Sequence, residues 1–169
     1  MKIVNDYVRL MLFCAGLLLG IQIPALTDQY TKRVDAKLLE SSQLLAGFQL
    51  TADRYFKGSI EQLILHYKKS SDPVFNQDSQ NIQFIYERVQ ILKAEFAALQ
   101  GNSLSKAFHV LVRHDNAIMQ ETLSSYSYVI ILDPGAFLWG FACALFLSSF
   151  IESLMKLLGL CIFKTKRAS

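Results

Sequence analysis

Residues Leu10–Leu26 read LMLFCAGLLLGIQIPAL, seventeen residues among which Gln22 is the only polar one. A helix of about 20 residues is long enough to cross the hydrocarbon core of a bilayer, which is about 30 Å thick. The two residues before Arg9 extend the apolar stretch to that length if the Arg9 side chain reaches toward the lipid headgroups. We therefore predict a first transmembrane helix over residues 7–26.

A cleaved signal peptide is the alternative interpretation of the same stretch, because basic residues precede a short apolar run. Signal peptidase prefers a small side chain two positions before the last residue it leaves on the leader, and Ile23 occupies that place if cleavage follows Ala25. Phe13 directly before Cys14 does not suit a lipoprotein-type site. The sequence therefore favours a retained membrane anchor.

A second apolar stretch, AFLWGFACALFLSSFI, covers Ala136–Ile151 and follows Asp133-Pro134-Gly135. Asp as N-cap with proline at the first helical position is a strong helix start, since the carboxylate accepts orphan backbone N–H bonds and proline lacks one N–H. We predict a second transmembrane helix over residues 133–155. The next segment, LLGLCIF, either continues this helix or lies along the membrane surface.

Two polar side chains fall inside or at the edge of these helices. Glu152 and Lys156 are one helical turn apart near the end of the second helix, which predicts an ion pair at the membrane interface. The alternative is a functional carboxylate within the membrane, because such groups often mark ion or proton paths. Gln22 is the corresponding polar residue of the first helix.

Basic residues give the predicted orientation, because Lys and Arg are enriched on the cytoplasmic flanks of membrane helices. Arg113 is the only basic residue close before the second helix. Four follow it, namely Lys156, Lys164, Lys166 and Arg167. We therefore expect a protein of the bacterial inner membrane with both termini and the basic tail 156–169 in the cytoplasm. The domain over residues 27–132 then lies in the periplasm.

Small residues recur every four positions along both apolar stretches. Residues four apart share one helix face, and small side chains there let two backbones approach closely in lipid. The two helices can pack on each other, or each can pack on a second copy or on another membrane protein. The predicted packing residues are Gly16, Gly20, Ala136, Gly140, Ala144 and Ser148.

The intervening residues show helical periodicity in several runs, which predicts an all-α domain. The first run, about Thr27–Phe56, stops at Gly58, and Ser59 with Gln62 resembles a capping box that opens a short helix. Its apolar stripe comprises Tyr30, Val34, Leu38, Leu45, Phe48, Ala52 and Tyr55. A later run alternates three- and four-residue steps, the pattern of a packed helix: Ile82, Ile85, Val89, Leu92, Phe96 and Leu99. Short turns between long helices favour an antiparallel bundle.

The remaining segments carry weaker patterns. Ser70–Gln80, SSDPVFNQDSQ, has the composition of a loop. A fourth helical run, predicted to follow Gly101-Asn102 and to fade at Ser124, carries Leu104, Phe108, Leu111, Val112, Ile118 and Met119. Tyr126–Leu132, YSYVIIL, predicts an extended return to the membrane interface, where tyrosines are favoured.

No catalytic, cofactor or metal motif occurs in the chain. His109, His114 and Asp115 form the only suggestive cluster, but the histidines are five apart, whereas helical metal pairs stand four apart. The three cysteines, Cys14, Cys143 and Cys161, lie in or beside the apolar stretches and give no disulfide framework. Residues 27–132 hold eleven basic and eleven acidic side chains, so no nucleic-acid surface is indicated.

The arrangement resembles a family of bacterial two-span inner-membrane proteins whose domain has no known function. The resemblance is carried by FCAGLLLGIQIPALTDQYTKRVDA (Phe13–Ala36), by GFQLTADRYF (Gly47–Phe56), and by the return segment from Ser127. It implies a membrane location and two spans, and it transfers no catalytic residue. Asp133-Pro134-Gly135 is more polar than the usual entry to the second span of that family.

Three functions are consistent with these features. A non-enzymatic envelope scaffold that docks a partner through the helical domain fits a folded domain without chemistry that is tethered at both ends. A ligand sensor fits a bundle between two spans. A sensor also needs an output module, and only a short basic tail follows the second span, so a separate partner would have to supply that module. A small channel or transport accessory would use Gln22 and Glu152 in an oligomeric pore.

Overall fold

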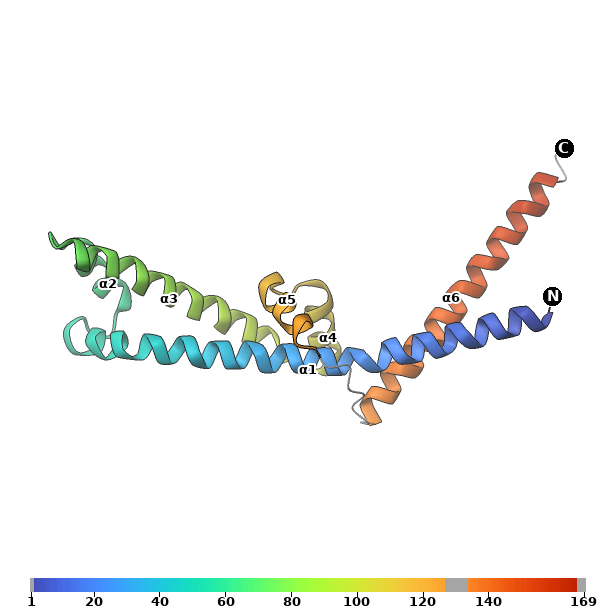
Figure 1. Ribbon diagram of the computed structural model, residues 1–169, viewed down its shortest axis with the longest axis horizontal. Helices are drawn as coiled ribbons and strands as arrows, with labels where there is room; N and C mark the ends of the chain where they lie inside the picture. The colour runs from blue at the N-terminus through green and yellow to red at the C-terminus, as the bar shows by residue number, and fades with distance from the viewer. Residues whose placement is uncertain (1, 127–133, 167–169) are drawn as a thin grey trace. The chain divides into compact units, whose positions relative to one another are not determined.

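The computed structural model describes residues 2–126 and 134–166, with side chains for residues 6–126 and 134–153. Over these ranges the chain is all-helical, as predicted, and contains six helices and no strand (Figure 1). Their bounds are α1 Lys2–Tyr55, α2 Ile60–Lys68, α3 Pro73–Ala98, α4 Ser103–Val112, α5 Asn116–Ser124 and α6 Pro134–Lys166.

Helix α1 joins the predicted first membrane helix and the first run of the central domain in one uninterrupted helix of 54 residues. It ends where predicted. Lys57 and Gly58 both have positive φ, 53° and 85°, and the Gly58 N–H donates to the carbonyl of Ala52. Glycine adopts this left-handed conformation without steric cost, which makes it a common helix stop.

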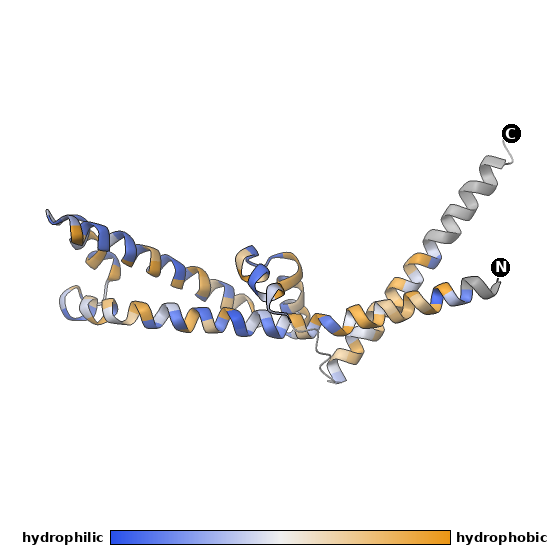
Figure 2. Cartoon of the chain, viewed as in Figure 1, coloured by the Kyte–Doolittle hydropathy of each residue, from blue (hydrophilic) through white to orange (hydrophobic). Residues whose placement is uncertain are grey.

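The chain divides into two compact units. The central unit comprises residues 29–125, and the terminal unit comprises the described parts of residues 1–28 and 126–169. Helix α1 contributes to both. Figure 2 shows hydrophobic residues dominating the N-terminal part of α1 and the described part of α6, whereas they alternate with hydrophilic ones elsewhere.

A hydrophobic cluster in the central unit packs α1, α2 and α3 together. Its buried members are Leu45, Ala52, Ile60, Leu63, Ile64, Ile82 and Val89. The predicted stripe of α3 is confirmed, because its residues are buried or partly buried. The stripe of α1 is confirmed except at Tyr55, whose side chain is exposed at the end of the helix.

The prediction of a loop over Ser70–Gln80 is wrong for most of that segment. Helix α3 already begins at Pro73, because the Asp72 side chain accepts the backbone N–H of Val74 at 2.9 Å and proline suits the first helical turn. The polar residues that suggested a loop lie in the first turns of the helix. Only a short turn separates α2 from α3.

The fourth predicted run is in fact two helices, because α4 ends at Val112 and α5 begins at Asn116. Asp115 caps α5 by accepting the N–H of Ile118 at 3.0 Å. The predicted apolar face is correct for Ile118 and Met119, which are buried, but wrong throughout α4. There Ala107 and Val110 face inward, and the four apolar residues of the predicted face are exposed: Leu104, Phe108, Leu111 and Val112.

Helix α6 begins at Pro134, which is consistent with the predicted start of the second apolar helix. It continues to Lys166, so the segment after residue 155 is helical rather than a separate surface segment. The extended conformation predicted for Tyr126–Leu132 and the capping role predicted for Asp133 fall almost wholly outside the described residues.

Candidate functional site

Helices α1 and α6 approach closely in the terminal unit at the glycines. A Cβ atom built on Gly16 would lie 2.9 Å from the Cα of Ala144, and one on Gly20 would lie 2.8 Å from the Cα of Gly140. Real Cβ atoms do not pack that tightly against backbone, so these positions accept only hydrogen. The paired numbers rise on α1 as they fall on α6, so the two helices run antiparallel.

The other small residues of α6 lie on the same buried side. Buried residues there include Ala136, Ala144 and Ser148. The rings of Phe13 and Phe141 meet edge to face beside the glycines, with centroids 6.3 Å apart. The structure therefore brings Gly16, Gly20, Gly140 and Ala144 together within one chain.

Large apolar side chains cover the outside of this helix pair. Leu138 and Phe146 are each 73% exposed. Other exposed apolar residues are Leu10, Met11, Leu18, Leu19, Phe137, Phe141, Leu145 and Phe150. Within the described residues, two helices are long and apolar enough to cross a membrane, with candidate spans in Asp6–Tyr55 and Pro134–Ser153. A water-soluble protein buries its large apolar side chains. This helix pair has the opposite arrangement, with small residues between the helices and large apolar residues outside.

Both polar residues that the sequence singled out in these helices have partners. The Tyr126 hydroxyl donates to Gln22 Oε1 at 2.6 Å, and an Arg9 guanidinium nitrogen lies 3.3 Å from a Glu152 carboxylate oxygen. The side chain of Lys156, the predicted partner of Glu152, falls outside the described residues. The Arg9 side chain is largely exposed and that of Glu152 is partly exposed, and the two residues lie at the ends of the apolar stretches.

A buried polar network in the central unit joins α1, α3, α4 and the start of α5. The fully buried Tyr30 donates its hydroxyl proton to Glu95 at 2.6 Å, and the backbone N–H of Asp115 donates to the same hydroxyl oxygen at 2.9 Å. His109 Nε2 lies 2.8 Å from the carboxylate oxygen that Tyr30 contacts. One tyrosine thus connects three segments that are far apart in sequence.

Sequence reasoning missed this network because Tyr30 was assigned to an apolar stripe and Glu95 was not singled out. The available signal was the position of Glu95, three residues after Leu92 in the packed stripe of α3. A carboxyl group so close to a buried stripe needs hydrogen-bond donors. Only a tertiary contact could supply Tyr30 as the donor.

Burial raises the pKa of Tyr30 above its ordinary value of about 10, and the hydrogen bond to Glu95 raises the pKa further. In the unfolded chain this hydroxyl loses its proton near pH 10, whereas in the folded chain it keeps the proton to higher pH. The unfolded state therefore binds fewer protons in this window, and rising pH favours unfolding.

We expect the thermal stability of the central unit to be insensitive to Tyr30 ionisation below about pH 10 and to decrease above it. Circular-dichroism melts between about pH 8 and pH 11 measure this decrease, and a Tyr30→Phe variant should lose stability less steeply over the same interval. Equal slopes for the two proteins would contradict the role assigned to the Tyr30 hydroxyl.

Each member of the histidine cluster has a partner within the chain. His109 contacts Glu95, His114 Nδ1 contacts the carbonyl of Val110 at 2.8 Å, and Asp115 caps α5. Among the described residues no group of three histidine, cysteine or acidic side chains is placed to hold a metal ion.

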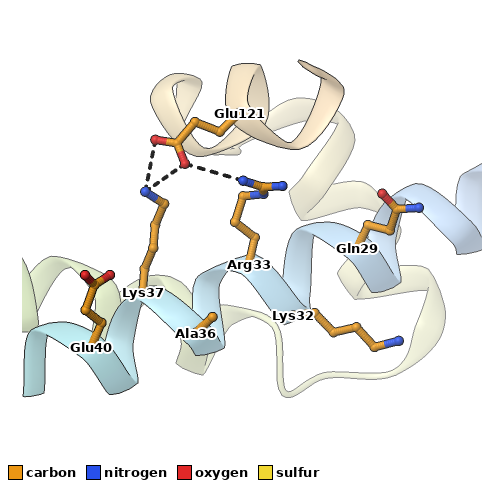
Figure 3. Close-up of a pocket in the computed structure, with 7 residues that line it drawn as sticks. All are labelled: Gln29, Lys32, Arg33, Ala36, Lys37, Glu40 and Glu121. Carbon is orange, nitrogen blue, oxygen red and sulfur yellow. Dashed lines mark hydrogen bonds and ion pairs between the residues drawn. The ribbon is translucent and has the colours of Figure 1, made fainter. Parts of the chain in front are cut away.

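A charged pocket of about 460 Å³ lies between α1 and α5 in the central unit (Figure 3). Glu121 of α5 accepts a hydrogen bond from Lys37 Nζ at 2.9 Å through Oε1. Its Oε2 forms ion pairs with the same nitrogen at 2.8 Å and with an Arg33 guanidinium nitrogen at 3.6 Å. The hydrogen bond from Lys37 lowers the pKa of the Glu121 carboxyl, and the charges of Lys37 and Arg33 act in the same direction. The lining residues are Gln29, Lys32, Arg33, Ala36, Lys37, Glu40 and Glu121.

A family model described as "Protein of unknown function (DUF2937)" matches residues 4–163 of the chain. The match includes both apolar helices and the whole central unit, and it agrees with the resemblance to a family without known function. No curated protein and no solved structure matches the chain.

Proposed function

Because this chain belongs to the DUF2937 family, whose description assigns no activity, we propose its role from its own geometry. It is a non-enzymatic membrane protein with two transmembrane helices, and its all-helical domain docks a partner protein outside the membrane. The observation that carries the proposal is the helix pair of the terminal unit, with glycines inside and large apolar side chains outside.

Lipid is the solvent that suits this outer surface. In water, the exposed leucines and phenylalanines of α1 and α6 would each forfeit about 1.5–3 kcal/mol of burial. A soluble core helix would instead present such residues to protein. Since α1 and α6 run antiparallel, two spans place both termini on one side. The basic residues that follow the predicted second span, from Lys156 to Arg167, favour the cytoplasmic side of a bacterial inner membrane.

The α4 apolar face, formed by Leu104, Phe108, Leu111 and Val112, supports a docking role for the central unit. These positions share one side of the helix and are exposed, while Ala107 and Val110 fill the inward side. A contiguous exposed apolar surface of this kind is typical of interaction sites. The occupant we propose is an apolar helix face of a partner protein.

An antiparallel bundle of the central unit, in the periplasm, is part of the same proposal. The channel hypothesis gains no support, because Gln22 contacts Tyr126 and Glu152 contacts Arg9.

Photocrosslinking in cells tests both parts of the proposal. A photoreactive residue at Phe108 or Leu111 should give a discrete protein adduct in membranes that have been washed with alkaline carbonate. The same residue at Gln90 or Lys93, exposed polar positions of α3, should give none.

The possible outcomes separate the two parts. Release of the chain by carbonate contradicts the membrane assignment. Equal adducts from both sets of positions, or adducts with lipid alone, contradict docking of a protein on the α4 apolar face. An adduct with a second copy of the chain identifies the partner as the protein itself.

A further inference from the structure

We propose that the pocket between α1 and α5 binds a phosphate group, presented either by an anionic phospholipid headgroup or as free phosphate. Lys32, Arg33 and Lys37 supply three cations to its lining, against the carboxylates of Glu40 and Glu121. Of these cations, Arg33 and Lys37 are the two that face Glu121 (Figure 3). This inference concerns a ligand of the central unit and goes beyond partner docking.

Two of the cations already converge on one anionic position. Arg33 and Lys37 are four residues apart on α1, so they share a helix face, and Figure 3 shows both side chains extending toward Glu121. Each is largely buried by its surroundings, with 30% and 21% of the side chain exposed. The limited exposure restricts the conformations open to both side chains, which reduces the entropy cost of binding.

Glu121 occupies the place that a phosphate oxygen would take. Its side chain is about half exposed, and its carboxylate can turn toward water without disturbing helix α5. A phosphate group offers more acceptor oxygens and more charge than a carboxylate, and an arginine guanidinium matches phosphate geometry. Phosphate can therefore displace Glu121 from Lys37 and Arg33.

The lipid arm of this inference rests on the proposed membrane insertion. Along α1, Lys32 and Arg33 follow Leu26 by six and seven residues, or roughly 10 Å at the helical rise. The headgroup region extends roughly 5–7 Å beyond the hydrocarbon core. Long basic side chains reach that distance, so a phospholipid phosphate lies within range of the pocket.

The test measures phosphate binding to the full chain in two settings. Calorimetric titration of the detergent-solubilised protein with inorganic phosphate reports the free ligand. Nanodiscs of phosphatidylcholine, with and without phosphatidylglycerol, report the lipid through co-purified anionic lipid. Lys37→Gln should weaken the binding of inorganic phosphate and of the anionic lipid by at least about ten-fold each, because a charge-assisted hydrogen bond is lost. Glu121→Gln should strengthen both by roughly three-fold, because the competing carboxylate is gone.

Opposite signs for these two variants are the discriminating result. If the Lys37–Glu121 contact served only the fold, both substitutions would act alike, so weakening by Glu121→Gln overturns the proposal. Arg54→Gln removes one cation from the same helix outside the pocket and should leave binding unchanged. No binding of either ligand, or binding unaltered by Lys37→Gln, also overturns it.

The two arms separate this inference from the proposed function. Binding of free phosphate without enrichment of anionic lipid supports a phosphate site in the pocket and excludes the lipid headgroup as the source of the phosphate group. Carbonate extraction, scored on the same preparations, reports membrane insertion independently of both titrations.

Discussion

Replacing Gly20 with leucine is expected to separate helix α1 from α6 and to destabilise the pair by about 1–3 kcal/mol, or more if the backbones cannot move apart. A Cβ at this position would meet the Cβ of Cys143 and the carbonyl oxygen of Trp139, each at 2.7 Å. The obstruction is backbone rather than a flexible side-chain end, so no rotamer change relieves it.

Unfolding of the solubilised protein by dodecyl sulfate measures this effect, and Trp139 is a suitable probe because it is the only tryptophan. Gly47→Leu is the matched control in the same helix, since nothing lies within 4 Å of a Cβ built there. Leucine also favours helix by about 0.5–1 kcal/mol over glycine, so the control should be as stable as the parent or more so. Identical midpoints for Gly20→Leu and the parent would contradict the close approach.

Replacing Tyr30 with phenylalanine is expected to cost the central unit about 1–3 kcal/mol, although it removes a single oxygen atom. The substitution leaves the backbone N–H of Asp115 without its acceptor and removes one of the two partners of the Glu95 carboxyl, which keeps His109. Buried groups that lose a partner bear the full desolvation penalty. Ring packing is kept, so the loss reports the hydroxyl.

Thermal melts near neutral pH measure the loss, and amide exchange at Asp115 and Ile118 shows whether the start of α5 opens first. Tyr55→Phe is the control, because Tyr55 is an exposed tyrosine at the end of the same helix. Its melting temperature should match that of the parent. A Tyr30→Phe variant as stable as this control would show that the network contributes nothing.

The long periodic elements were predictable because their patterns repeat over many turns. The stripe Ile82–Leu99 and the stop at Gly58 depend on local sequence, and both are confirmed. The four-residue spacing of small residues included the four that lie closest between α1 and α6, namely Gly16, Gly20, Gly140 and Ala144. The spacing could not decide whether α1 packs on α6 of the same chain or on a helix of a second copy, because both arrangements satisfy the same pattern.

The failures occur where one capping side chain or a tertiary contact decides the outcome. The cap by Asp72 turned a loop composition into the start of α3, and the cap by Asp115 divided one predicted helix into two. In α4, the apolar face predicted from periodicity was Leu104, Phe108, Leu111 and Val112, yet Ala107 and Val110 are the buried residues. The pocket at Glu121 arises from residues about 85 positions apart, for which a single sequence holds no signal.

The glycine contact also explains why the register between the apolar helices α1 and α6 is fixed. Gly16 and Gly20 are flanked on α1 by bulky neighbours, among them Leu17, Leu19 and Ile21. A slip by one residue would drive one of these against the backbone of α6, at a point where even a methyl group is too large. The absence of a Cβ atom at the glycines therefore fixes the alignment of the two helices. This holds in lipid, where an apolar side chain gains little by contacting protein instead of lipid.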